Sequence, residues 1–594
     1  METTIGVSRL LSSGSSDVSK GTSTPESNTP SFKLVEDICK RQKRLEKARF
    51  NTDTLWDDVD RFVTSRRSHY NVGYIRGDSP NDQGGKDIYD DAAADAIQKF
   101  SDNFQSQTAS PLIDWWMSRF RGPLKDDSRA MKWMDETKES ATYELNRSPF
   151  FEEYNEAVQD CTSHGVATMA GPEWNWEKSI LDFQEHHPRE IFMWFDIHGK
   201  PLGWHQKFPI TGKQILTEFP DAELPEAFKR KIYGDPSANP FREFMCIHAI
   251  YKRDERDIKS MAATDKKWAS VWLIETERVL LRDSGYDDVD QPMDTWIWRK
   301  GNSGLYAFYP ASDAIYSIIM ENNAAKSLLK AVQLSVEPPL IMTEGVKGNV
   351  NFFPLGQTIL HNPNDKVQAF QFPTNFQVGV EQVNDLRKQL ATRFRADLFT
   401  MMADLPATTK AFTAASVQGE KASGLIPIIT RSSNNLLIPK LNKIMRTLAI
   451  AKRLPPPPPS IMRYARSIVD IEMMGPLATA AKRFLTQQPF NSMMAQLEQV
   501  EAVTKEAPEF FKAIMQGFNA DEFRKLIVTG NSAPQKLLYD DDQLAQIKQA
   551  AMKAMQEQKH LQQMQMIAKA ARDGGQAPEE GSPTASMMGG GGGA

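Results

Sequence analysis

Two stretches with helical spacing of apolar residues, separated by a segment that cannot continue a helix, constrain the fold most. The first stretch, 311–335, ends before Pro338-Pro339, and proline stops a helix. The second stretch, 374–402, keeps its apolar residues on one stripe. The segment 336–373 between them is rich in Gly, Pro and Asn. We therefore expect two long helices that bracket a compact, β-like insert.

Three further helices are expected nearer the N-terminus. The spacing of apolar residues predicts one over 31–49 and a second over 54–66, with a cap at Asp53 or Thr54. A third begins after Asp90 or Asp91, buries one stripe and stops before Pro111.

The pattern changes between residues 162 and 298 to short apolar or alternating runs separated by Gly, Pro and Asp. Such runs are typical of strands, and His198-Gly199-Lys200 is predicted to be the turn between two of them. Residues 31–310 are therefore expected to form a helical plus β-rich region, which makes the fold class α+β.

The C-terminal part is predicted to return to helices. A loop over 404–409 leads to a helix at 431–451 that Pro439 kinks, and 461–473 is predicted to be a strand. Residues 476–571 have a helix-forming composition. The Ser-, Thr- and Pro-rich residues 1–30 and the Gly-rich residues 572–594 are expected to be disordered.

The composition limits the classes of function. The chain has 71 Lys plus Arg against 76 Asp plus Glu. Because neutralising phosphates needs an excess of basic residues, this balance disfavours a protein that binds nucleic acid over most of its surface. Its three cysteines, Cys39, Cys161 and Cys246, lie far apart and are expected to be reduced thiols. No run of about 18 apolar residues occurs, so we expect no membrane span.

Motifs for catalysis are not found in the sequence. A phosphate-binding loop would need a glycine where Lys207 stands and a Ser or Thr where Gln214 stands. His186-His187 lacks the ligand spacing of a metal site, and adjacent residues of a strand point to opposite faces. The acidic clusters at 57–60, 287–290 and 540–542 lack the spacing of a calcium loop. We expect no catalytic residue, no cofactor and no metal. We therefore expect that the chain is not an enzyme.

Several short motifs occur in an order that is similar to the head-to-tail connector (portal) family of short-tailed bacteriophages. They run, in chain order, Ile88-Tyr89-Asp90, Thr108-Ala109-Ser110-Pro111, Trp115-Trp116, Gly165-Val166-Ala167, Pro188-Arg189-Glu190, Asp196-Ile197-His198-Gly199, Pro338-Pro339, Pro354-Leu355-Gly356, Phe412-Thr413-Ala414-Ala415 and Gly475-Pro476-Leu477-Ala478-Thr479-Ala480. The series covers roughly residues 53–483. One element departs from the family pattern, because Tyr306-Ala307-Phe308-Tyr309-Pro310 stands where the family has a glycine-containing motif.

The resemblance implies a ring, commonly of twelve subunits, around an axial channel for double-stranded DNA. It assigns 31–310 to a wing, 311–335 and 374–402 to stem helices, 336–373 to a clip, 403–475 to a tunnel loop and wing return, and 476–571 to a crown. It implies assembly in the host cytoplasm, a place at one capsid vertex of the virion, and packaging and ejection of DNA. The implied partners are the terminase packaging ATPase, tail or adaptor proteins and the capsid protein or scaffold, with no membrane.

Basic residues in and after the second stem stretch are the candidates for contact with DNA phosphates in such a channel. They are Arg387, Lys388, Arg393, Arg395 and Lys410. The equally open alternative is that they form ion pairs between subunits, with acidic residues such as Asp385 or Asp397. A net charge of −5 suits a conduit through which DNA slides without being held.

Two other classes of protein are alternatives to a portal. The first is an internal or tail structural protein without a channel, against which the order helix, insert, helix speaks. The second is a nuclease or terminase, which would need clustered acidic metal ligands that the sequence does not show.

Overall fold

The computed structural model describes most of the chain, in two units that are considered separately. The units are Met1–Ala481 and Lys482–Ala594. The described residues are 30–65, 87–120, 124, 127–233, 238–257, 259–299, 306, 308–343, 350–351, 357, 363–364, 366–370, 376–399, 423–463, 469–479 and 541–573. The 404–409 loop and Lys410 lie outside these residues.

The first helix, α1 (Pro30–Phe62), is continuous where two helices were expected. Asp53, the expected cap of a second helix, instead lies inside α1 and pairs with Arg49 one turn earlier, at 2.9 Å from Nε. Arg49 is itself buried and donates to the backbone carbonyls of Pro188, Arg189 and Ile191. The predicted break is wrong because these contacts hold the middle of the helix in place.

Three helices follow α1 and pack with it into the main core. Helix α2 (Ala92–Thr108) buries Ala93, Ile97, Phe100 and Phe104, as predicted from their spacing. The Asp90 carboxylate accepts a hydrogen bond from the backbone N–H of Ala92, which stabilises the first turn. The other two helices are α3 (Ser128–Asn146) and α4 (Phe150–His164).

The region 162–298 is β-rich, as expected, and is mainly one antiparallel sheet of five strands in sequential order. Its strands are β4 (Ile191–Phe195), β5 (Pro201–Thr211), β6 (Glu243–Lys252), β7 (Trp268–Ile274) and β8 (Val279–Tyr286). The turn predicted at His198-Gly199-Lys200 is confirmed between β4 and β5, and the Asp196 side chain accepts the N–H groups of His198 and Lys200. The short α5 (Gly212–Glu218), α6 (Glu226–Ile232) and η2 (Ala263–Asp265) lie in its connections.

Two smaller sheets join distant parts of the chain. In the three-stranded sheet, β2 (Val166–Asn175) pairs with both β3 (Ile180–His186) and β9 (Asp294–Ile297). In a two-stranded sheet, β1 (Trp116–Phe120) pairs with β12 (Val469–Met473). The predicted strand at 461–473 is therefore half right, because its first residues belong to α12 (Pro459–Arg463).

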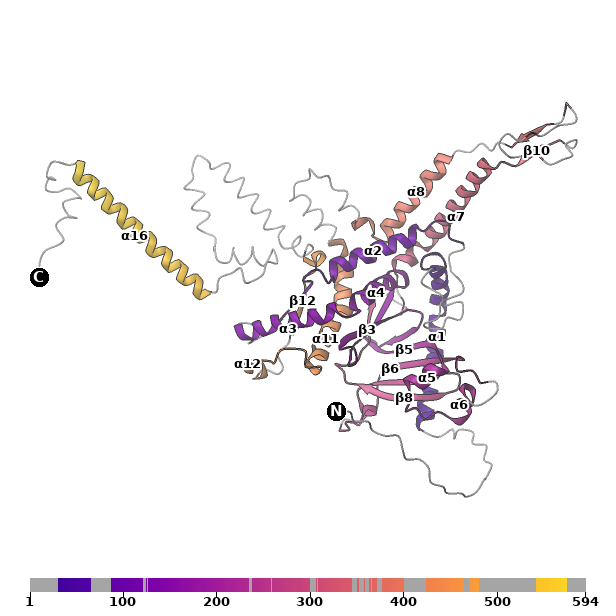
Figure 1. The fold of residues 1–594 in the computed structure, drawn as a ribbon, viewed down its shortest axis with the longest axis horizontal. Coiled ribbons are helices and arrows are strands. Elements are labelled where there is room, and N and C mark those ends of the chain that lie inside the picture. The colour runs from indigo at the N-terminus through magenta and orange to yellow at the C-terminus, as the bar shows by residue number, and fades with distance from the viewer. Residues whose placement is uncertain are drawn as a thin grey trace, which may run out of the picture. The chain divides into compact units, whose positions relative to one another are not determined.

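The order helix, insert, helix is present as predicted (Figure 1). Helix α7 (Pro310–Val336) and helix α8 (Phe376–Arg393) lie side by side, and the insert between them contains an antiparallel pair, β10 (Leu340–Met342) and β11 (Val367–Ala369). Helix α8 ends earlier than the expected residue 402, because Arg395 has a left-handed φ of 59° that breaks the helical path.

A long helical segment, 423–450, completes the first unit's core. Before Pro439 it widens into a π-helical stretch, η3 (Ser433–Leu437), and it continues as α11 (Ile438–Ile450). The wider turn accommodates a residue that has no N–H to donate, so the predicted irregularity at Pro439 takes this form.

The second unit contributes one described helix, α16 (Asp541–Asp573), within the region where helices were expected. Its side chains are mostly exposed, including Met552, Leu561, Met564 and Met566. Among the described helices of either unit, none has the length and hydrophobicity that a membrane crossing requires.

Candidate functional site

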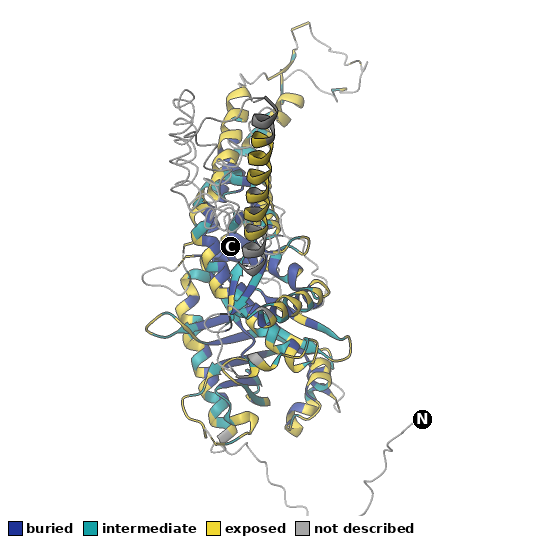
Figure 2. Cartoon of the chain, turned by 90° about the vertical axis from the view of Figure 1, so that its left-hand side faces the viewer, coloured by how far each residue is buried: buried dark blue, intermediate teal, exposed yellow. Residues whose placement is uncertain are grey.

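The α7–α8 pair changes in character along its length (Figure 2). Near the sheets it is buried, with Ala314, Ile315 and Ile318 of α7 and Leu386 and Leu390 of α8 in the core. Toward the insert it exposes large apolar side chains. These are Leu329, Val332, Leu334 and Val336 of α7, Val378 and Val380 of α8, and Ile341, Met342 and Phe370 of the insert.

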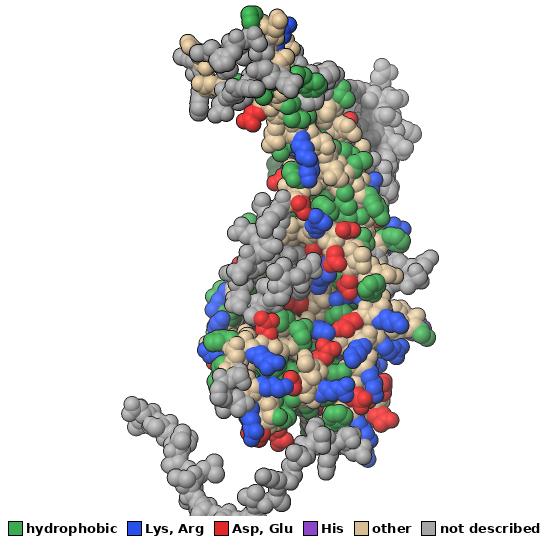
Figure 3. Space-filling view, turned by 90° about the vertical axis from the view of Figure 1, so that its right-hand side faces the viewer, with side chains coloured by type: hydrophobic (Ala, Val, Ile, Leu, Met, Phe, Trp, Pro, Cys, Tyr) green, Lys and Arg blue, Asp and Glu red, His purple; other side chains and the backbone are tan. Residues whose placement is uncertain are grey.

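The composition of the surface also differs between the helix pair and the sheet-containing part. Figure 3 shows hydrophobic and uncharged side chains over much of the projecting helix pair, whereas basic and acidic side chains are interspersed over the sheet-containing part. Large apolar side chains that gather on an exposed surface often mark a site of protein interaction. The outer half of the pair is therefore the candidate interaction surface of the first unit.

The base of the same helix pair holds a compact group of charges. Arg387 of α8 donates to the Asp90 carboxylate from Nη2 at 2.7 Å and from Nε at 2.9 Å. The Glu321 carboxyl of α7 is hydrogen-bonded to the Asp90 carboxyl and lies 3.9 Å from Arg387 Nε. Beside them, the Asn322 side chain donates to the carbonyl of Asp87 and accepts the N–H of Tyr89. This charged junction joins α7 and α8 to the start of α2.

The pKa values of the two carboxyl groups move in opposite directions. Burial and the neighbouring Asp90 carboxylate raise the pKa of Glu321 to about 8. For Asp90, burial acts against ionisation, but the hydrogen bonds from Glu321 and Arg387 lower its pKa below the ordinary value. Asp90 therefore carries the negative charge of the pair near neutral pH, and Glu321 carries the proton.

The structure gives three of the five predicted phosphate-facing residues a partner inside the chain. Arg387 is bound to Asp90, Arg393 donates to the carbonyl of Asp313, and Arg395 donates to the carbonyl of Gly424 at 2.8 Å. Lys388 is different, because its side chain is 81% exposed and its contact with Asp385 is long, at 3.8 Å. Arg387, Lys388 and Arg393 lie on α8, and Arg395 follows the end of the helix.

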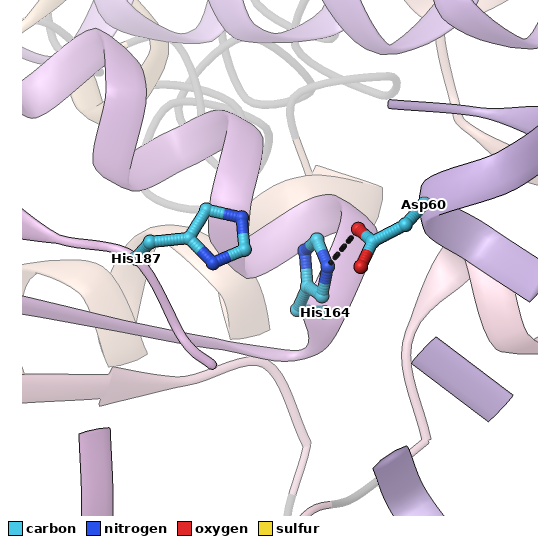
Figure 4. Close-up of side chains that lie close together, drawn as sticks. All are labelled: Asp60, His164 and His187. Carbon is cyan, nitrogen blue, oxygen red and sulfur yellow. Dashed lines mark hydrogen bonds and ion pairs between the residues drawn. The ribbon is translucent and has the colours of Figure 1, made fainter. Parts of the chain in front are cut away.

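A second charged cluster joins α1, the end of α4 and the β3–β4 turn (Figure 4). His164 Nε2 lies 2.9 Å from Asp60 Oδ1, and the His187 ring faces His164 with 5.0 Å between ring centroids. Arg189 Nε contacts the other Asp60 oxygen at 2.5 Å. Burial opposes ionisation of Asp60, but the hydrogen bond with His164 and the charges of His164 and Arg189 hold its pKa well below the usual range.

The same cluster is where the described residues come nearest to a metal site. Asp60, His164 and His187 each offer one ligand atom, and these atoms lie within 4.8 Å of one another. Two histidines and one carboxylate form a ligand set that divalent transition metals accept. The guanidinium of Arg189, however, already neutralises the carboxylate. The contacts present are those of a link between three segments. His186 points elsewhere, with Nδ1 3.1 Å from Gln206 Nε2.

A buried lysine forms the third polar feature, which sequence reasoning missed. Lys440 of α11 is fully buried, and its ammonium group donates to the carbonyls of Met169, Gly171 and Pro292 and lies 3.0 Å from Asp294. Burial lowers its pKa, and Asp294 opposes that shift. The signal in the sequence that could have indicated this burial is the position of Lys440 on the same helical stripe as Leu437, Leu441 and Ile444. This lysine fastens α11 to the β2–β9 sheet.

Comparison with known families decides between the alternatives. Residues 35–538 match the model of a family described as bacteriophage head to tail connecting protein. The chain belongs to this family. The match extends through the β-rich region, the α7–α8 pair and the insert, and reaches beyond the span of the short motifs, 53–483, at both ends.

Two relatives of the chain are described as portal proteins. A probable portal protein of Bordetella phage BPP-1 is 22% identical over 539 residues, which cover 87% of this chain and 92% of that protein. The portal protein of Salmonella phage epsilon15 is 20% identical over 449 residues, covering 74% of this chain and 79% of that protein.

Among solved structures, similarity is found to chains of gene transfer agent (GTA) particles. One is described as the neck of an empty GTA particle computed with C6 symmetry, with a TM-score of 0.35, 10% identity, and coverage of 75% of this chain and 91% of that one. Another is the neck of a native GTA particle computed with C12 symmetry, with a TM-score of 0.31, 10% identity, and coverage of 74% and 91%.

Proposed function

We propose that this chain is the portal subunit of a tailed bacteriophage, forming a ring at one capsid vertex through which double-stranded DNA is packaged and ejected. The observation that carries the proposal is the family match over residues 35–538, together with two portal relatives aligned over most of their length. A structural role, rather than catalysis, follows from this membership.

Ring assembly would explain why the α7–α8 pair exposes large apolar side chains. A closed ring needs heterologous contacts, in which one face of a subunit meets a different face of its neighbour. Apolar side chains on the outer half of α7 would be covered in such a ring, which removes the cost of leaving them in water.

Assembly through this surface makes a direct prediction. Replacing Leu329 and Val332 together by Glu should abolish rings, because it would bury two charges in a subunit contact. Replacing the exposed Ser327 by Glu adds charge to the opposite side of α7, away from Leu329 and Val332, and should leave rings intact. Native mass spectrometry and electron microscopy of the full chain measure this. Rings that persist in the double variant would show that another surface holds the subunits together.

Contact with the DNA backbone is proposed for Lys388 ahead of the other four basic candidates. Arg387, Arg393 and Arg395 already donate inside the chain, whereas the Lys388 side chain is largely exposed. Sparse cationic contacts would guide phosphates without the steep affinity of a dense basic surface. Lys410, which lies outside the described residues, stays a candidate for contact with the DNA backbone.

Replacing Lys388 by Gln should reduce the amount of DNA packaged per particle while ring formation stays normal. The loss arises because one phosphate contact is removed from every subunit. Packaged DNA length and ring yield are measured side by side, with exposed Lys330 replaced by Gln as the control. Loss of rings in the Lys388 variant would instead support the alternative of an ion pair between subunits.

The remaining partners are proposed from the family. The insert between α7 and α8 would meet the terminase packaging ATPase while the capsid fills and tail or adaptor proteins afterwards. The sheet-containing region would contact the capsid protein or scaffold. Assembly would take place in the host cytoplasm, and the mature ring would reside in the virion.

One experiment separates the three classes of protein considered. The purified full chain is imaged by electron microscopy and assayed for nuclease activity with added divalent metal. Rings with a central hole support the portal proposal. Compact particles without a hole would support a non-channel structural protein, and metal-dependent DNA cleavage would support an enzyme.

A further inference from the structure

The charged junction at the base of the α7–α8 pair contains one negative group more than its cation can neutralise. Asp90 and Glu321 are two carboxyl groups in direct contact, and Arg387 is the cation bound to them. Asp91 adds a further negative charge close to Glu321. The Glu321 side chain is 2% exposed, so water cannot solvate a charge on it.

The geometry shows which group is left without compensation. Arg387 directs two N–H groups at the same oxygen of Asp90 and approaches Glu321 only at 3.9 Å. Glu321 Oε1 is buried and accepts no hydrogen bond. An ionised Glu321 would therefore be a buried carboxylate beside another carboxylate, which is strongly unfavourable. A protonated Glu321 can instead donate to Asp90, and the charge of Asp90 is then balanced by that of Arg387.

We propose that the junction is a proton-dependent link, in which a proton shared by Glu321 and Asp90 holds α7 and α8 against the start of α2 and its loss loosens that attachment. The link joins three separate elements, because Asp90 precedes α2, Glu321 lies on α7, and Arg387 lies on α8, 297 residues after Asp90. Its opening would free the base of the helix pair without unfolding the sheets.

The other charged groups nearby are already paired or act elsewhere. On the α1 side, Arg61 is paired with Asp87 at 2.5 Å. On α7 itself, Lys326 lies over the Tyr89 ring. Helix α4 carries Asp160, whose charge acts on Cys161. Along α2, Lys99 is paired with Asp95. Within the described residues, these pairings leave Arg387 as the cation that acts on Glu321.

The sign of the pH dependence follows from the raised pKa of Glu321. The folded junction holds its proton up to about pH 8, whereas an exposed glutamate releases it near its ordinary value of 4.5. The contribution to stability is therefore full below pH 4.5, declines as pH rises, and is lost once pH passes 8. Between pH 6 and pH 9 the equilibrium for opening the junction should rise on the order of ten- to a hundredfold.

The test is hydrogen–deuterium exchange of the full chain at pH 6 and pH 9, corrected for the intrinsic pH dependence of exchange. In the unmodified chain, protection of residues 87–95 and of the middle of α7 should fall at pH 9. In Glu321→Gln, which keeps a neutral hydrogen-bonding group, protection should be the same at both pH values. Glu381→Gln removes a carboxylate from the exposed face of α8 and should behave like the unmodified chain.

A second variant keeps the test decisive if Glu321→Gln does not fold. Asp90→Asn removes the competing carboxylate, leaves Glu321 with Arg387, and should also abolish the pH dependence. Unchanged protection between pH 6 and pH 9 in the unmodified chain would overturn the proposal. A fall in protection at pH 9 that is equal in the unmodified chain and in both variants would overturn it as well.

Discussion

Replacing Lys440 by methionine is expected to lower the free energy of unfolding of the first unit by about 3 kcal/mol. The ammonium group satisfies three backbone carbonyls and one carboxylate in a site that excludes water. Methionine fills a similar volume but donates nothing, so the carbonyls of Met169, Gly171 and Pro292 would each lose the hydrogen bond that Lys440 donates in this buried site. Each such group costs about 1–3 kcal/mol.

Chemical denaturation followed by tryptophan fluorescence measures this loss. The control is Lys443→Met on the same helix, because Lys443 contacts the same Asp294 but binds the side chain of Gln291 rather than backbone carbonyls. It should cost clearly less than Lys440→Met. Equal effects of the two variants would show that the Asp294 ion pairs, not the carbonyl contacts, carry the energy.

Replacing Asp60 by alanine is the second large effect, and we expect a loss of about 3–5 kcal/mol because a buried ion pair is broken from one side. Arg189 would keep only its bond to Asp57, and the buried His164 would lose its carboxylate partner. Thermal unfolding of Asp60→Ala is compared with that of Asp58→Ala, which removes an exposed aspartate from the same turn of α1.

The pH dependence of the Asp60 variant supplies an independent check. A carboxyl whose pKa is lowered by folding stabilises the protein above its unfolded pKa, and this stabilisation is lost as pH falls through the folded value. The difference between the unmodified chain and Asp60→Ala should therefore be constant near neutral pH and shrink in strong acid. A difference that is the same at all pH values would mean that only packing was lost.

The helix pair could be predicted from the sequence because local signals decide it. Pro338-Pro339 ends α7, and one apolar stripe extends along α8. The end of α8 could not be predicted, since the stripe continues through Leu398 while the backbone of Arg395 turns left-handed. Likewise, the spacing around Asp53 indicates two helices, but contacts of Arg49 with residues about 140 positions away keep α1 continuous.

The charged junction and the partners of the basic candidates could not be predicted either, because they also depend on contacts between residues far apart in the sequence. Asp90, Glu321 and Arg387 carry no local pattern, because their attraction depends on a fold that brings three distant elements together. The five basic candidates were chosen by their position on the second stretch. A sequence cannot show that three of them donate to groups of the same chain.

The pairing of β1 with β12 has a mechanical consequence. The chain leaves β12 at Met473, opposite Trp116, and the Met474 N–H donates to the carbonyl of Trp115 at 2.7 Å. Just beyond, a side chain on Gly475 would meet the carbonyls of Gln107 and Thr108 at 2.6 and 2.8 Å, so the backbone there lies directly on the end of α2. Tension applied to the chain beyond Thr479 would therefore load the β1–β12 pair and the end of α2, together with the buried Leu477 that follows them.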